Sequence, residues 1–374
     1  MTRIRPIPQA RPVQARLIAL AAVATASLML AACSDYGNLP KEMRPLPKET
    51  RELITQKGMK DTAPVLVRIY KEESKLEVWK RQEATGRYAY LKSFDICKWS
   101  GQLGPKKEEG DRQAPEGFYT ITPAQMNPKS SYYLSFNLGY PNAFDKAHGR
   151  TGAHLMVHGA CSSAGCYSMT DAQMEEIYSL GRLAFQGGQR SFQVQAYPFR
   201  MTAENMARHH GDPNMPFWRI LKEGSDHFEL TGQVPKIDVC DRRYVFNATS
   251  EGGAFDPTSA CPPMSVPPQI TQLVAQKQAE DDAKASILVA QLQADEERVK
   301  AKAAAAAVEI AEAPQPAEPV AEPINVGSIV VAQPQAAAAP QPQADEAVAY
   351  APEPARKERG GITGFFSGVT GLFR

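Results

Sequence analysis

Short runs rich in Val, Ile, Tyr and Phe recur along the chain after residue 62, with turn residues between them. The runs predict β-strands over 64–70, 75–80, 88–94, 118–122, 132–136 and 153–158. Gly-Pro, Asn-Pro and Tyr-Pro-Asn sequences at 104–105, 127–128 and 140–142 mark loops between some of these runs. The pattern therefore predicts a sheet-rich domain.

Helical spacing appears later and less often. Thr170 opens a capping box with Gln173, and apolar residues keep a helical period until Gly187-Gly188 ends it. Two further helices are predicted over 203–210 and from 216 to about 221. Together with the strands they indicate an α+β domain over 63–264 with a few peripheral helices.

The chain changes character beyond the predicted domain. Residues 265–313 are rich in Ala, Gln, Glu and Lys, which predicts a long, solvated helix. Residues 314–374 are dominated by Ala, Pro and Gln and end in a short basic, apolar segment. That composition predicts a disordered, low-complexity tail.

The N-terminus has the pattern of an export signal. Four arginines and no acidic residue precede the apolar run 17–30. The run ends in the sequence Leu30-Ala31-Ala32-Cys33. This ending resembles a bacterial lipobox, so residues 1–32 are predicted to be a lipoprotein signal peptide and Cys33 the lipidated residue. An ordinary signal peptide with an incidental cysteine is the alternative. Residues 33–62 are predicted to be a polar tether.

The predicted lipid chains would hold the protein on a membrane surface without a spanning helix. Ser34 beside the lipidated cysteine resembles an outer-membrane sorting signal. We therefore expect a periplasmic, lipid-anchored protein at the outer membrane.

Charge excludes one class of partner. The net charge is +1, and without the four arginines of the signal the remainder sums to 1 − 4 = −3. Nucleic-acid binding needs a concentrated basic field, so no nucleic-acid partner is expected.

The densest chemistry lies between His154 and Asp171. A strand-like run ends at His158-Gly159, a loop of small residues follows, and Cys166 comes shortly before the capped helix. Small residues let a substrate backbone approach closely. A histidine and a helix N-terminus near a thiol favour the thiolate, so His158 and Cys166 have the chemistry of a base and a nucleophile.

The segment VHGACSSAGCYSMTD is similar to the signature of the L,D-transpeptidase (YkuD) catalytic domain, and Ala196-Tyr-Pro-Phe-Arg-Met201 adds a likeness to its YafK-like branch. The resemblance covers about 63–250 and implies a YkuD-like β-sandwich. It also implies a cysteine acyl-transfer enzyme that attacks the L-centre carbonyl of diaminopimelate in peptidoglycan stem peptides. No cofactor and no metal are expected.

The resemblance assigns roles to individual positions. Cys166 matches the nucleophile, His158 the general base, and Gly165 the residue whose backbone N–H, with its neighbours, faces the oxyanion. Substrate binding is assigned to Arg200, Ser163 and His154, with a structural ion pair as the alternative for Arg200 and packing beside the site for His154. Ala164 stands where typical members have a histidine, which leaves the acceptor specificity open.

Three functions remain open at this stage. The resemblance to the YafK-like branch implies, besides transpeptidation, an amidase or hydrolase that releases a wall-linked lipoprotein. A non-catalytic envelope lipoprotein that anchors the cell wall is the alternative from another class. A zinc site built from the histidines and cysteines of the 154–166 segment is a less favoured alternative, because its spacing lacks a Cys-x₂-Cys knuckle.

The cysteines predict at least one free thiol. Cys33 is assigned to lipid, and five cysteines remain in an exported chain where disulfides persist. Cys240 and Cys261 are predicted to pair. Cys161 has two candidate partners, Cys97 and Cys166, and the second pairing would remove the nucleophile.

Overall fold

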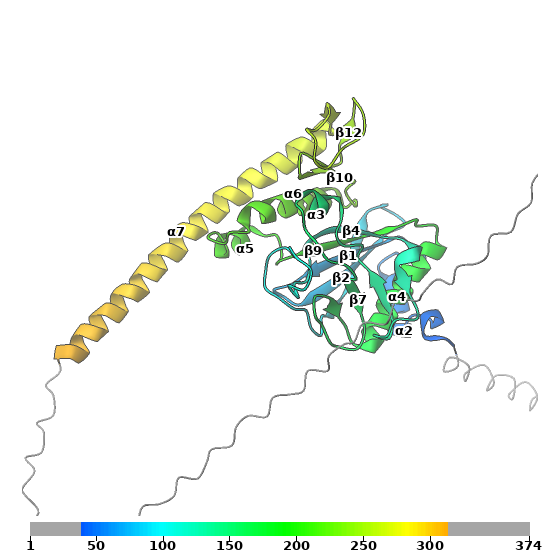
Figure 1. The fold of residues 1–374 in the computed structure, drawn as a ribbon, viewed down its shortest axis with the longest axis horizontal. Helices are drawn as coiled ribbons and strands as arrows, with labels where there is room; N and C mark the ends of the chain where they lie inside the picture. The colour runs from blue at the N-terminus through cyan, green and yellow to red at the C-terminus, as the bar shows by residue number, and fades with distance from the viewer. Residues whose placement is uncertain (1–38, 313–374) are drawn as a thin grey trace, which may run out of the picture. The chain divides into compact units, whose positions relative to one another are not determined.

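The computed structural model describes residues 39–312 and shows an α+β domain built on two main sheets (Figure 1). The larger sheet has the order β3-β2-β1-β9-β4. Its strands are β1 (Val65–Tyr70), β2 (Lys75–Arg81), β3 (Tyr88–Asp95), β4 (Gly117–Ile121) and β9 (Phe192–Tyr197). The β1–β9 pair is parallel, and the other neighbours are antiparallel.

The second sheet has the order β5-β6-β7-β8 and much shorter strands. They are β5 (Met126–Asn127), β6 (Ser135–Asn137), β7 (Met156–His158) and β8 (Tyr167–Ser168). The β7–β8 pair is parallel. Two small hairpins complete the strands: β10 (Ile237–Cys240) with β11 (Arg243–Phe246), and β12 (Thr249–Ser250) with β13 (Met264–Ser265).

Helices pack around the sheets, and the last three of them belong to the C-terminal part of the described chain. The 3-10 helices are η2 (Lys41–Met43) and η3 (Pro123–Gln125). The α-helices are α2 (Lys48–Gln56), α3 (Ala143–Ala147), α4 (Asp171–Gln186), α5 (Ala203–Arg208), α6 (Met215–Thr231) and α7 (Pro268–Glu312). Within the described residues, no helix is long and apolar enough to cross a bilayer.

The larger sheet is buried on both faces, which explains the continuous apolar run of β1. Alternate side chains of a strand point to opposite faces. Val65, Val67 and Ile69 join a core that includes the second sheet and α4. Tyr70 joins a second core with Trp218 of α6 and the β10–β11 hairpin. The domain thus has three layers around the larger sheet, and the short-stranded sheet is one outer layer.

The helix predicted after Thr170 is confirmed. The Thr170 side chain accepts a hydrogen bond from the Gln173 N–H, and the Gln173 side chain completes the capping box. The helix α4 contacts β1, β6 and β7, so it joins the two sheets. Its N-terminus follows β8 directly, which places it near the candidate site.

Two predicted segments differ from the structure. Residues 48–56 of the expected tether form α2, because Thr50 and Ile54 are buried against the domain. The helix predicted to end near Leu221 continues to Thr231 as α6. There Lys222 pairs with the buried Asp226 one turn later, so the polar stretch does not interrupt the helix.

The strand β9 was not predicted, although it lies in the middle of the larger sheet. The predicted long helix corresponds to α7. The predicted signal peptide, Cys33 and the predicted low-complexity tail lie outside the described residues.

Candidate active site

The register of β7 and β8 brings His158 and Cys166 to one face of the short-stranded sheet. Val157 pairs with Tyr167 and His158 with Ser168 in a parallel ladder. One step back along both strands, Cys166 stands beside Met156. Because side chains alternate between faces, Cys166 shares its face with His158.

Main-chain groups hold the sulfur of Cys166. The Met156 N–H donates to Sγ at 3.4 Å, and Sγ lies 3.7 Å from the His154 carbonyl oxygen, which accepts the thiol proton. Among residues 39–312, Cys166 is the one free cysteine, and its side chain is half-buried. The structure records no direct hydrogen bond between Sγ and the His158 ring within that range. The Cys166 sulfur thus lies against the main chain at the edge of β7.

The imidazole of His158 is held in one tautomer. Its Nδ1 lies 2.5 Å from the Gly159 carbonyl oxygen. A carbonyl only accepts, so Nδ1 carries the proton and Nε2 carries the free lone pair. Burial lowers the pKa of His158, while the bond to Gly159 raises it. The side chain is only 2% exposed and is therefore poised as a neutral base.

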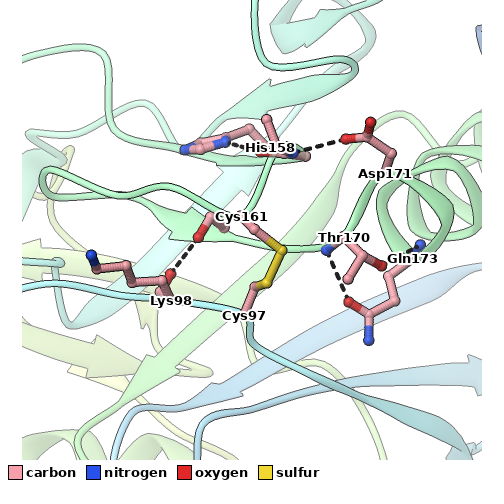
Figure 2. The surroundings of a disulfide bond; sticks show 10 residues. Cys97, Lys98, His158, Cys161, Thr170, Asp171 and Gln173 are labelled. Atoms are coloured by element: carbon pink, nitrogen blue, oxygen red, sulfur yellow. Dashed lines mark hydrogen bonds between the residues drawn. A yellow bond between two sulfur atoms is a disulfide. The ribbon is translucent and has the colours of Figure 1, made fainter.

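Crowding around Gly159 explains why a glycine follows the histidine. A Cβ at this position would lie 2.6 Å from Asp171 Oδ1 and 3.0 Å from the Tyr132 carbonyl oxygen. The Asp171 carboxylate also accepts the Ala160 N–H at 2.8 Å, as Figure 2 shows. The first turn of α4 thus fixes the start of the loop between His158 and Cys166.

Ser163 organises the end of the same loop. Its Oγ donates to the Cys166 carbonyl oxygen at 2.6 Å and accepts the N–H groups of Cys166 at 3.1 Å and Gly165 at 3.3 Å. Gly165 has a φ of +126°, a backbone conformation that favours glycine. The predicted oxyanion donors are therefore engaged by Ser163 in this structure. Ser163, predicted to bind substrate, here contacts the nucleophile's own backbone.

The electrostatics differ from the expected thiolate. Burial raises the pKa of the Cys166 thiol, against a lowering by the Met156 N–H and by the charge of Lys106. The ammonium of Lys106 is itself paired with Asp111 and donates to the Glu108 carbonyl at 2.6 Å. With His158 also shifted toward its uncharged form, the resting pair is a neutral thiol and a neutral imidazole.

Two other predicted site residues have different surroundings. The side chain of His154 is exposed, its φ is +58°, and it contributes its carbonyl to the Cys166 thiol. Arg200 donates to Glu77 at 2.6 Å and lies over the ring of Tyr70, 4.4 Å from its centroid. Arg200 thus forms the structural ion pair that the sequence left as its alternative.

The cysteine pairs answer the question left open by the sequence. Cys97 is bonded to Cys161, and Cys240 to Cys261, as predicted for the second pair. The first bond, shown in Figure 2, involves Cys97 and Cys161 and leaves Cys166 free. This bond also removes one candidate ligand of the alternative zinc site, because zinc binds a thiolate and not a disulfide sulfur.

Sequence reasoning missed three neighbours of the catalytic pair. The Tyr132 ring lies 4.6 Å from the His158 ring and covers it. Asp171 begins α4, and Lys106 lies well before the 154–171 segment in the chain. Tyr132 and Lys106 come from loops far from the motif in sequence, so no local pattern identifies them. The Gly159 position, crowded by Asp171, is the signal that the motif did contain.

This geometry can be compared with known proteins. Residues 61–184 match the L,D-transpeptidase catalytic domain (YkuD) family. A protein of Escherichia coli (strain K12) named "Putative L,D-transpeptidase YafK" is 40% identical over 222 residues, which cover 59% of this chain and 87% of that protein. The chain belongs to the L,D-transpeptidase family. A protein of the same name from Escherichia coli O157:H7 has the same identity and coverage.

Two solved structures match this L,D-transpeptidase family member at lower identity. The helical cell shape determining protein Pgp2 from Campylobacter jejuni is 19% identical, with a TM-score of 0.30, covering 51% of this chain and 80% of that one. Bd1075 of Bdellovibrio bacteriovorus is 20% identical, with a TM-score of 0.26, covering 37% and 49%.

Proposed function

We propose that this L,D-transpeptidase family member is a cysteine acyl-transfer enzyme acting on peptidoglycan stem peptides. The proposed bond is the one at the L-centre carbonyl of diaminopimelate. Cys166 attacks that carbonyl, an amine leaves, and a thioester joins the substrate acyl group to Sγ. Family membership supports the substrate class, and the geometry of Cys166 and His158 supports the reaction type.

The observation that carries the proposal is the fixed tautomer of His158 on the face that it shares with Cys166. Because Nδ1 donates to Gly159, Nε2 is the atom left to accept a proton. The proposed reaction requires the Cys166 proton to turn from the His154 carbonyl to Nε2 when substrate binds. A structural histidine would not need its free nitrogen on the face of the only free thiol among the described residues.

The chemical steps balance through these two side chains. As the S–C bond forms, the Cys166 proton passes to His158 Nε2, and the imidazolium returns it to the departing amine as the C–N bond breaks. The N–H groups of Gly165 and Cys166 would receive the oxyanion once the Ser163 hydroxyl turns away. An acceptor amine then attacks the thioester, the C–S bond breaks, and the sulfur recovers a proton by way of His158.

The acceptor decides the outcome. An amine of a second stem peptide gives transpeptidation, whereas water gives hydrolysis and, where the departing amine belongs to a wall-linked protein, its release. Both outcomes use the same thioester. We propose transpeptidation as the main reaction, and the experiment below reports both.

We also propose that the protein is exported to the periplasm. There a lipid on Cys33 anchors it to the outer membrane, facing the cell wall. Two disulfides in the described residues support an oxidising compartment. Intact-mass analysis of the membrane fraction should find acyl chains on Cys33. An unmodified N-terminus cut elsewhere would refute the anchor and leave the catalytic proposal intact.

The reaction is tested with purified full-length protein and three defined substrates: a disaccharide tetrapeptide, the same with an acceptor amine, and one carrying a peptide linked through lysine. Mass spectrometry should find a thioacyl adduct on Cys166 and a cross-linked product when the acceptor is present. Free acid alone would shift the assignment to a hydrolase. The Cys166→Ala protein should give no adduct and no product.

The same experiment separates catalysis from wall anchoring. Cys166→Ala should still sediment with purified peptidoglycan if its substrate surface is intact. Sedimentation of both proteins, with no adduct and no product from the folded parent on any substrate, would favour the non-catalytic anchor and overturn the enzyme proposal.

A further inference from the structure

The two disulfides differ sharply in their exposure. Cys97 and Cys161 are both exposed, whereas Cys240 is fully buried and Cys261 half-buried. A dithiol must reach a sulfur atom to open a disulfide, so exposed disulfides are the ones that react and regulate. The exposed bond therefore opens first under mild reduction.

The exposed disulfide lies on the loop that joins the proposed base to the proposed nucleophile. Cys161 is in the middle of residues 159–165, between His158 and Cys166. Cys161 and its neighbour Ala160 have φ values of +45° and +65°, a left-handed conformation that residues with a Cβ disfavour. External contacts must hold this part of the loop.

The two halves of the disulfide are anchored unequally by main-chain hydrogen bonds. Cys97 is fixed by the main chain: its N–H donates to the Ser168 carbonyl at 2.8 Å, and the Ser168 N–H returns a bond to the Lys98 carbonyl at 2.9 Å. Cys161 has one main-chain bond, from its N–H to the Met169 carbonyl at 3.2 Å. Opening the disulfide frees Cys161 much more than Cys97.

We propose that the Cys97–Cys161 disulfide positions the loop between His158 and Cys166, so that reduction by a dithiol switches the enzyme to a low-activity state. The inference rests on the proposed function. The dithiol gives two electrons and two protons, the S–S bond breaks, and two thiols and an oxidised dithiol result. The loop then relaxes from its left-handed turn, and the face shared by base and nucleophile loses its alignment.

The test uses the full chain carrying Cys33→Ser, so that Cys166 is its single free thiol before reduction. Stepwise dithiothreitol with iodoacetamide trapping and peptide mass spectrometry should find Cys97 and Cys161 open before Cys240 and Cys261. Turnover of the tetrapeptide with acceptor should fall in parallel, by about 10- to 100-fold, the range expected for a misplaced catalytic group. Oxidised glutathione should restore it.

Two double variants give matched controls. C97S/C161S should start at the low turnover of the reduced parent and no longer respond to dithiothreitol. C240S/C261S also loses one disulfide but should keep both the turnover and the response. Thermal melting of each protein shows whether a loss of turnover is simply a loss of fold, and the mildly reduced parent with Cys240–Cys261 intact replaces any variant that fails to fold.

The outcomes separate this inference from the proposed function. Full turnover by folded C97S/C161S, or by the parent with Cys97 and Cys161 open, overturns the positioning role while the enzyme proposal stands. Absence of turnover in the fully oxidised parent would instead count against the proposed function itself.

Discussion

The two main sheets hold their residues by different means. The larger sheet has strands of five to eight residues, and every residue of β1 is buried. The smaller sheet has strands of two or three residues, yet His158 ends β7 and Cys166 directly precedes β8. Few ladder hydrogen bonds hold the smaller sheet in place. Contacts of Ser163 and Asp171 and the Cys97–Cys161 bond therefore also position its strands and the loop between them.

The difference indicates that the two sheets have different roles, one in stability and the other in positioning side chains. Apolar burial in the larger sheet provides most of the free energy of unfolding. Side-chain contacts around the smaller sheet set the positions of the reacting atoms. Substitutions in the larger sheet should therefore change stability, and substitutions around the smaller sheet should change turnover. Measuring urea unfolding and turnover for each variant tests this separation.

The largest expected effect is on stability, at the end of β1. Lys71 and Glu116 form an ion pair that is 0% exposed on both sides. Lys71→Met leaves the Glu116 carboxylate buried without its cation, and urea unfolding should show a loss of about 3–5 kcal/mol. Lys60→Met removes one partner of the exposed pair with Glu83 and should cost about 1 kcal/mol or less. Equal losses would contradict the comparison.

Ser163→Ala tests the role of the smaller sheet. The Cys166 carbonyl loses its donor at 2.6 Å and the loop loses its anchor, so kcat should fall about tenfold from misplacement of the nucleophile. The free energy of unfolding should change by only about 1 kcal/mol, as for one net hydrogen bond. Ser162→Ala, at the exposed neighbouring position, should leave both unchanged. A raised kcat would show that Ser163 blocks the oxyanion donors.

A smaller effect concerns the pH dependence of the thiol. Because burial raises the pKa of Cys166, its thiolate fraction at neutral pH should lie below that of an ordinary cysteine. In the Cys33→Ser chain, iodoacetamide alkylation should be several-fold slower at pH 7 than in the same unreduced chain in urea, and should rise steadily through pH 9. A rate that is flat below pH 7 would mean a resting ion pair instead.

The smallest effect on turnover is expected at Arg200. Its side chain is 44% exposed, but that of its partner Glu77 is only 5% exposed, so Arg200→Ala should cost about 1–3 kcal/mol in urea unfolding. KM for the tetrapeptide should stay within roughly twofold, as expected for a surface substitution away from the site. A large increase in KM would restore the carboxylate-binding role that the sequence suggested.

Much of the larger sheet could be predicted because burial leaves a pattern in the sequence. β1 to β4 follow apolar runs, and α4 follows a capping box. β9 alternates apolar with Gln residues, a weaker signal than the run of β1, and was missed although it is central. β8 has only two residues and forms through pairing with β7, so no local pattern could predict it.

The site was predicted only as far as its motif extends. His158, Cys166 and Gly165 lie in one segment, whereas Tyr132 and Lys106 reach it through the fold. The direction of a side chain within a loop is also invisible in sequence. Ser163 was therefore assigned to substrate, although its hydroxyl turns inward to the backbone of Cys166.

The main-chain contacts of the catalytic pair have a consequence for how this site tolerates sequence drift. The groups that touch Cys166 Sγ and His158 Nδ1 are the His154 carbonyl, the Met156 N–H and the Gly159 carbonyl. Replacing the side chains at 154 and 156 leaves these main-chain groups in the chain, so the contacts to the proposed catalytic pair do not depend on which side chains stand there. Alanine scanning would pass over them. Only an edit to the backbone itself, such as an ester in place of the Met156 amide, would reveal what they do.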